Sequence, residues 1–256
     1  MQLFPIKTQI IEKNADLVNI LITSMKKSKI KPMNGDILVV SSKVVALTEG
    51  RMVNYKTVKP SEKAVNLARE YDLESGFVEL VLQEADSVFS GVKRAILTMK
   101  NNIFIANAGV DHSNAPENHA ILWPKNPSLS ADNIRKELKK RLNVGIGVIL
   151  SDSHCTPLRT GTTGFALATS GFDAVIDERG KTDLFGKKMR ITQRAVADGL
   201  ASAAVAIMGE TDEKIPAVLI RDAKIKLTGR LSKSSTYFSP NECLFSSIYK
   251  ENVLRN

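Results

Sequence analysis

The chain alternates between short apolar runs and segments whose apolar positions recur at helical spacing. Apolar runs bounded by Gly, Asn or Asp are typical of buried strands. The clearest runs lie at 36–47, 95–99, 102–110, 144–150 and 216–221. The polar residues 100–102 join two of these runs, which predicts a hairpin and therefore a sheet that is at least partly antiparallel.

Four segments between these runs are expected to be helices. In the third, Ile134, Leu138 and Leu142 repeat every four residues, and Ser130 is the expected N-cap. Gly209 is expected to end the fourth, which is rich in small residues. The mixed order of helices and strands favours an α/β or an α+β fold. The four helical segments are 60–71, 76–89, 130–142 and 193–210.

Length and composition indicate a folded chain with a substantial core. It has 256 residues, of which 43% are hydrophobic, and no clear linker divides it, so we expect a single domain with a small excursion around 171–193. No apolar run approaches the roughly 18 residues of a membrane helix. The absence of a visible signal peptide, together with only two cysteines, Cys155 and Cys243, predicts a cytoplasmic protein with free thiols.

The chain has a formal net charge of +9, which suggests an anionic partner. The basic residues are scattered, and aromatic residues make up only 5% of the chain. Single-stranded nucleic acid is therefore an improbable partner, because its bases need aromatic side chains on which to stack. A solvated basic surface and a small anionic substrate are the favoured interpretations.

Three carboxylates lie at the ends of predicted elements: Asp111, Asp152 and Glu210. If they converge, their oxygens would suit Mg²⁺ or Mn²⁺ rather than zinc, and such an ion could serve phosphoryl transfer. The alternative is that each is a turn residue or a helix cap. The neighbours His154 and Cys155 fit neither the ligand spacing of a zinc site nor a complete nucleophile triad.

The sequence has neither a P-loop nor a dinucleotide-binding glycine motif. A bound nucleotide would need other phosphate ligands. The backbone of 160–164 and the side chain of Arg159 are candidate donors.

Several segments resemble, in order and spacing, the coenzyme F420-0:γ-glutamyl ligase family. The resemblance spans about residues 3–221, and its most specific parts are NAGVDHSN and MGE followed by IPAV. The segments that carry it are GDILVVSSKVV (35–45), NAGVDHSN (107–114), SDS with PLRTG (151–161), DLFGKKM (183–189) and VADGLASAAVAIMGE through IPAVLIR (196–221).

The resemblance implies an α+β fold with largely antiparallel mixed sheets, a two-lobed subunit and an intertwined homodimer. It also implies a GTP-dependent ligase that adds L-glutamate to a carboxylate of F420-0 through an acyl phosphate. Mg²⁺ or Mn²⁺ would be the metal, with K⁺ as a further candidate ion.

The family motifs also imply roles for individual residues. Asp152 and Arg159 would be catalytic. The implied metal ligands are Asp111, Asp152, Ser153 and Glu210. The implied nucleotide contacts are Gln9, Ile10, Ile11, Ser41, Ser42, Lys43, Asn114, Gly209, Thr211 and Asp212.

The chain departs from the family pattern at three places. His154–Thr156 replace a segment that usually holds a glycine and an arginine, Leu47 replaces a lysine, and charged residues replace glycines after Glu210. Lys43 could take over a phosphate contact from the missing lysine. These departures leave open a folate- or pterin-like acceptor, and a non-catalytic relative that binds nucleotide or RNA.

Overall fold

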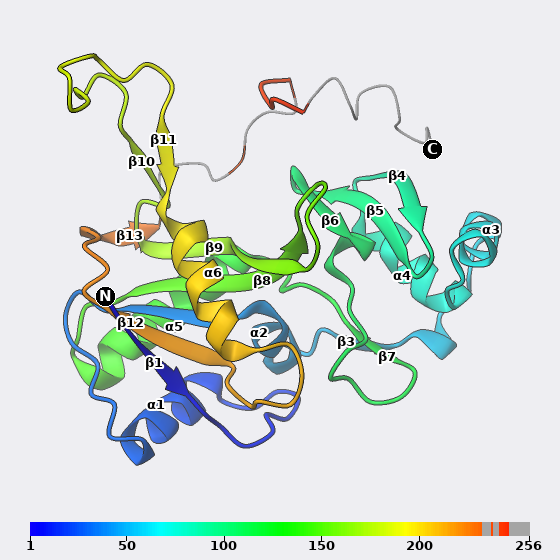
Figure 1. Cartoon of the computed structure of the whole chain (residues 1–256). Coiled ribbons are helices and arrows are strands. Elements are labelled where there is room, and N and C mark those ends of the chain that lie inside the picture. Colours follow the sequence, from blue (N-terminus) through cyan, green and yellow to red (C-terminus); the bar gives the residue numbers. More distant parts are fainter. Residues whose placement is uncertain (232–236, 238–240, 246–256) are drawn as a thin grey trace.

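A six-stranded sheet forms the centre of the computed structural model, which describes residues 1–231, 237 and 241–245 (Figure 1). Neighbouring strands are antiparallel except β2 and β8, which are parallel. The strand order is β1 (Gln2–Ile6), β12 (Ala217–Arg221), β2 (Ile37–Ser41), β8 (Gly147–Cys155), β9 (Thr162–Phe172) and β13 (Leu227–Leu231).

Helices cover both faces of this sheet. α1 (Leu17–Lys27) and α5 (Pro127–Leu142) pack on one face, and α6 (Val196–Met208) packs on the other. The alternation of side chains along β2 supplies both cores, because Leu38 and Val40 face α1 and α5 whereas Ile37 and Val39 face α6. A β-strand that is covered on both faces is therefore apolar at every position.

A second lobe, residues 52–122, has its own buried cores beside the main sheet (Figure 1). The two lobes together give the α+β fold, with mostly antiparallel sheets, that the sequence predicts. The elements of the second lobe are β3 (Met52–Asn54), α3 (Glu62–Tyr71), α4 (Ser75–Glu84), β4 (Ser87–Val92), β5 (Ala95–Lys100), β6 (Ile103–Ala106) and β7 (His119–Ile121), with 3₁₀ turns at Tyr55–Thr57 and Asn107–Gly109.

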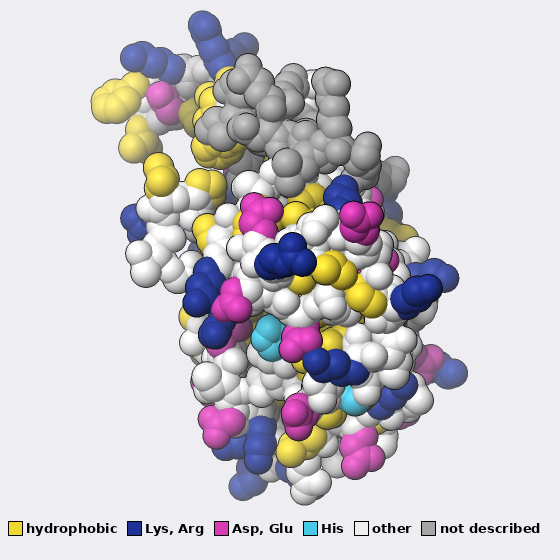
Figure 2. All heavy atoms as spheres, turned by 90° about the vertical axis from the view of Figure 1, so that its right-hand side faces the viewer, with side chains coloured by type: hydrophobic (Ala, Val, Ile, Leu, Met, Phe, Trp, Pro, Cys, Tyr) yellow, Lys and Arg dark blue, Asp and Glu magenta, His cyan; other side chains and the backbone are white. Residues whose placement is uncertain are grey.

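Residues 171–193, the expected excursion, form most of a projecting hairpin. Its paired strands are β10 (Val175–Asp177) and β11 (Gln193–Ala195) (Figure 1). Its far end carries the exposed side chains of Leu184 and Phe185. In the described part of the chain, no helix is long and apolar enough to span a membrane. Figure 2 shows basic and acidic side chains interspersed over the face that carries the second lobe, so the net charge does not gather in one patch there.

Two local predictions are confirmed. Asn101 and Asn102 adopt left-handed backbone angles (φ 52° and 62°) and connect the antiparallel strands β5 and β6. Gly209, with φ 71°, ends α6.

The predicted strand 36–47 is wrong beyond Ser41, where helix α2 (Ser42–Thr48) begins. An apolar run of this kind carries no periodicity that separates a buried strand from a buried helix. The predicted helix 76–89 is wrong at its end for the same reason, since α4 stops at Glu84 and β4 starts at Ser87.

Two helix starts are also corrected. Asn126, rather than Ser130, caps α5 by accepting a hydrogen bond from the backbone N–H of Leu129 (3.0 Å). Ser130 lies inside the helix, where its hydroxyl donates to Glu49 Oε1. Gln193–Ala195 belong to β11, so the last helix begins at Val196.

Candidate functional site

The site lies at one end of the strands of the main sheet, where chain segments distant in sequence come together. β1 and β2 both run antiparallel to β12, and β2 runs parallel to β8. The carboxyl ends of β1, β2 and β8 therefore lie beside the amino end of β12. Backbone bonds from Ser41 N to Pro216 O (2.9 Å) and from Thr8 N to Lys214 O (2.9 Å) fasten these segments to one another.

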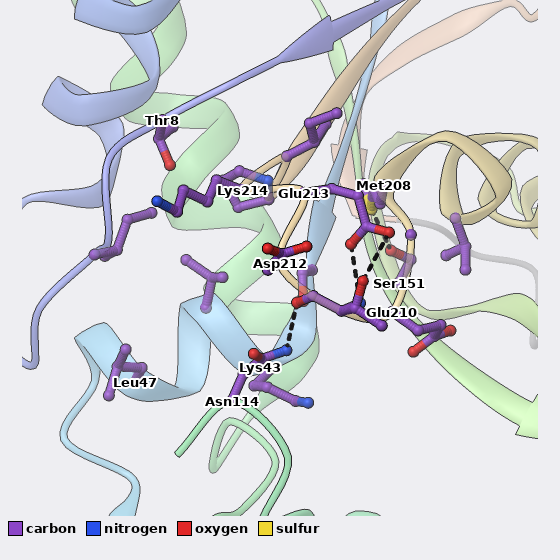
Figure 3. Close-up of a pocket in the computed structure, with 18 of the residues that line it drawn as sticks. Thr8, Lys43, Leu47, Asn114, Ser151, Met208, Glu210, Asp212, Glu213 and Lys214 are labelled. Atoms are coloured by element: carbon purple, nitrogen blue, oxygen red, sulfur yellow. Dashed lines mark hydrogen bonds between the residues drawn. The ribbon is translucent and has the colours of Figure 1, made fainter. Parts of the chain in front are cut away.

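A cavity of about 380 Å³ opens at these strand ends (Figure 3). It brings together most of the residues that the sequence implied as metal ligands or nucleotide contacts. The implied residues that line it are Gln9, Ile10, Ile11, Ser41, Lys43, Asp111, Asn114, Asp152, Ser153, Gly209, Glu210, Thr211 and Asp212. Ser42 lines a neighbouring cavity instead.

Asp111 is paired with Lys43, which comes from the first turn of α2. Lys43 Nζ lies 2.5 Å from Asp111 Oδ2 and donates to the Ser113 hydroxyl (2.7 Å). Ser113 also donates to Asp111 from its backbone N–H and its hydroxyl, each at 2.7 Å. Burial raises the pKa of Asp111, but the charge of Lys43 and these hydrogen bonds outweigh it, so the net pKa is lowered. Asp111 is therefore ionised at neutral pH.

Asp152 lies on β8, one residue beyond the segment of β8 that pairs with β2. Its Oδ2 accepts a hydrogen bond from the indole N–H of Trp123, and its Oδ1 accepts one from the backbone N–H of Ser153 (2.8 Å). Burial raises its pKa above the ordinary value, because these bonds, a further one from the Ser42 side chain and the more distant Lys43 compensate the loss of water only in part. A carboxylate with a raised pKa beside a cavity is a frequent mark of a functional position.

The lining of the cavity carries an excess of negative charge. Among the described residues, five carboxylates and two lysines line it: Asp111, Asp152, Glu210, Asp212 and Glu213 with Lys43 and Lys214. Asp111, Asp152 and Glu210 share the cavity, but no three His, Cys, Asp or Glu side chains of the described chain stand close enough to hold a metal ion together. A cation that gathers these side chains would need them to move closer together.

The loop after α6 closes one side of the cavity. Asn114 donates from Nδ2 to Thr211 O (3.0 Å), which ties the second lobe to this loop (Figure 3). The Glu213 carboxylate turns back and accepts bonds from the backbone N–H (2.9 Å) and the hydroxyl (3.1 Å) of Thr211. Bonds to its own and to the Thr211 backbone N–H lower the pKa of Glu213. A negative side chain thus lies on backbone donors that an external anion could otherwise use.

A second cavity of about 210 Å³ adjoins the first. Lys43, Asp111, Asp152 and Ser153 line both cavities. The second is completed by Trp123, His154, Cys155 and Thr162, among others. The carboxylates thus stand between two spaces, which is the arrangement that a reaction between two bound molecules needs.

The stretch 151–164, which holds the candidate phosphate donors, is largely strand. β8 continues to Cys155 and pairs with β9 from Thr162 onward. This hairpin places Arg159 at its exposed tip, and Arg159 lines neither of the two cavities. His154 packs against Phe165, with ring centroids 4.8 Å apart, and Cys155 is an exposed free thiol, as Cys243 is a free thiol elsewhere.

Sequence reasoning missed Trp123 and Ser113 and did not count Glu213 among the contacts. Ser113 lies inside the NAGVDHSN motif and could have been found there. Trp123 lies in no motif, and only the fold brings its ring to Asp152. Leu47, noted as a departure, lines the first cavity and adds apolar surface where a lysine would have added charge.

Comparison with known proteins identifies the family. The family described as F420-0:Gamma-glutamyl ligase matches residues 5–222. The coenzyme F420:L-glutamate ligase of Methanocaldococcus jannaschii is 40% identical over 193 residues, which cover 75% of this chain and 77% of that protein. That of Archaeoglobus fulgidus is 32% identical over 243 residues, or 94% of this chain and 95% of that protein. The chain therefore belongs to the F420-0:γ-glutamyl ligase family.

Proposed function

We propose that this chain is a GTP-dependent ligase that adds L-glutamate to a carboxylate of coenzyme F420-0, with Mg²⁺ or Mn²⁺ as the metal. Family membership and the names of its relatives support glutamate ligation. The observation that carries the proposal is the excess of carboxylates over lysines in the larger cavity. A polyanionic nucleotide can enter such a cavity only with cations beside it.

The oxygen ligands present suit a divalent ion in kind, and the carboxylates would have to move closer together to hold it. Asp111, Asp152 and Glu210 would hold it, with the Ser153 hydroxyl as a further oxygen ligand. The ion would neutralise charge on the nucleotide phosphates. Lys43 now neutralises Asp111, and its ammonium would be free to contact a phosphate oxygen once a metal takes over that role. K⁺ is a further ion that the proposal allows.

The chemistry needs two displacements. An oxygen of the acceptor carboxylate attacks the γ-phosphorus of GTP and releases GDP, which leaves an acyl phosphate. The glutamate amine then attacks the acyl carbon, loses a proton and expels inorganic phosphate. The nucleotide would occupy the larger cavity, contacted by Asn114 and the loop at 209–214, and the second cavity would receive the acceptor or the glutamate. A cytoplasmic homodimer belongs to the same proposal.

A direct assay tests this function. The purified chain is incubated with GTP, MnCl₂, L-glutamate and F420-0, and mass spectrometry follows glutamyl products while GDP and phosphate are counted. We expect one GDP and one phosphate for each amide bond, and none without metal. ATP in place of GTP tests the nucleotide preference. GTP binding without any coupled turnover would contradict the proposal and favour a non-catalytic relative.

The acceptor needs its own comparison, because His154 and Cys155 line the second cavity at the segment where the chain departs from its family. Folate and a pterin carboxylate are therefore offered beside F420-0 in the same assay. Products from F420-0 alone would support the proposal. Products from folate alone would replace its acceptor while leaving the ligase reaction in place.

A further inference from the structure

Trp123 reaches Asp152 from the boundary between the two lobes. It follows β7, and its side chain is only 2% exposed. Its indole N–H donates to Asp152 Oδ2, one of the two carboxylate oxygens that a metal could use. The ring also lines the second cavity, so it stands at the wall where the reacting groups would meet.

Two cations contact Trp123, and one carboxylate pairs with both of them. Arg51 Nε donates to the backbone oxygen of Trp123 (2.9 Å), and the Lys100 ammonium lies over the ring, 5.2 Å from its centroid. Glu84 pairs with both cations, with Arg51 at 2.7 Å. Lys100 lies on β5 and Glu84 on α4, and Arg51 directly precedes β3, so Trp123 is held at the junction of the two lobes.

Gly109 explains how the ring fits so close to the backbone. A Cβ at this position would overlap the indole of Trp123, and the φ of Gly109 is 72°. A glycine therefore serves both the left-handed backbone and the close approach of the ring. This gives the third residue of the NAGVD motif a physical role, which is to let Trp123 reach Asp152.

We propose that Trp123 is a positioning residue for Asp152, a role that rests on the proposed function. Its N–H fixes the rotation of the carboxylate, so that Oδ1 and the remaining lone pair of Oδ2 point to a bound cation. Without the indole N–H, only the Ser153 N–H and the Ser42 side chain would remain as partners, and they would hold the carboxylate less firmly. Outer donors of this kind typically change metal affinity by about 10- to 100-fold.

The chain offers an internal probe of this contact, because Trp123 is its only tryptophan. Titration of the wild-type chain with Mn²⁺ in the presence of GDP should quench the tryptophan emission, since the paramagnetic ion would bind beside the indole. Electron paramagnetic resonance of free Mn²⁺ measures the same binding independently. Binding seen by resonance with no change in emission would overturn the proposal, and this holds without any variant.

The matched variants are Trp123→Phe, which keeps an aromatic ring but removes the N–H, and Phe89→Leu, which removes a buried ring in the same lobe that packs on Phe104 (4.9 Å). We expect Trp123→Phe to weaken Mn²⁺ binding by about 10- to 100-fold and Phe89→Leu to leave it unchanged. Equal Mn²⁺ affinity in Trp123→Phe and the wild type would refute the role. If the wild-type chain binds Mn²⁺ but shows no ligase turnover, the proposed function is refuted and the positioning role of Trp123 stands.

Discussion

Two aspartates on the main lobe have pKa values that are shifted in opposite directions. Asp132 on α5 is 5% exposed, and Arg135 NH2 (2.7 Å), Lys136 Nζ (2.7 Å) and the Ser170 hydroxyl (2.8 Å) surround it. Burial raises its pKa, but these partners outweigh burial and bring the pKa to about 2. Asp152 receives hydrogen bonds from Trp123, Ser153 and the Ser42 side chain but has no ion-pair partner, and its pKa is raised.

The difference separates a carboxylate that stabilises the fold from one that is kept available. Asp132 has its charge matched within the protein, and it joins α5 to β9 through Ser170. Asp152 borders two cavities and has charge left unmatched. A buried group that costs stability and faces an open space is a candidate for a role in binding or catalysis. Substitutions at the two positions should therefore give opposite results.

The largest effect is expected from Asp152→Asn, which removes the charge and keeps the shape. Ligase turnover should fall below detection, because an oxygen ligand of the proposed metal loses its charge. The stability at pH 7 should stay equal or rise, since the raised pKa means that the ionised carboxylate is unfavourable in the folded state. The coupled assay and urea unfolding measure both. Asp177→Asn, on the projecting hairpin, is the control and should change neither. A fully active Asp152→Asn chain would contradict a role of Asp152 in the reaction.

Asp132→Asn should do the reverse and destabilise the fold without a direct effect on the reaction. The substitution leaves the buried Arg135 guanidinium without its counter-charge, which typically costs about 3–5 kcal/mol. Urea unfolding should show the loss as a lower midpoint, while turnover per folded molecule stays near wild type. A loss of turnover with unchanged stability would show that Asp132 acts in the reaction and does not stabilise the fold.

Acid should expose the stabilising role of Asp132. Because its folded pKa of about 2 lies below the ordinary value of 3.8, its contribution is full above about pH 4 and is lost as the pH falls through 2. The difference corresponds to about 2.5 kcal/mol. Unfolding free energies measured between pH 6 and pH 2 should fall more steeply for the wild type than for Asp132→Asn. Parallel curves would show that the carboxylate is not the group that titrates.

The smallest effect is expected from Glu213→Gln, which tests whether charge in the cavity opposes nucleotide binding. The Glu213 carboxylate lies on the Thr211 backbone N–H, where a phosphate oxygen could bind instead. Removing one negative charge should tighten GDP binding by about threefold at low salt and by less at high salt. Calorimetric titration at two salt concentrations measures this. Weaker binding would mean that Glu213 contacts the nucleotide favourably.

The sequence predicts the fold class and most of the cavity, for reasons that differ by residue. Asp111 and Asn114 are found because they lie in one contiguous motif, and Asp152 because it follows an apolar run. Trp123 could not be found, because its contact with Asp152 spans 29 residues and depends on the packing of two lobes. Arg159 was expected at the site from its motif, and its place at the tip of the β8–β9 hairpin depends on strand pairing that the motif does not specify.

The position of β12 in the main sheet has a consequence for how the chain folds. β12 lies between β1 and β2, so residues 217–221 must be present before Gln2–Ile6 can pair. Contacts between segments that lie so far apart in sequence slow folding, because a long loop must close before they form. During synthesis, most of the chain therefore has to wait for β12 with a strand edge uncovered. The loop that completes the cavity directly precedes β12, so the cavity forms only once β12 is in place. We therefore expect the nucleotide proposed to bind there to favour completion of folding.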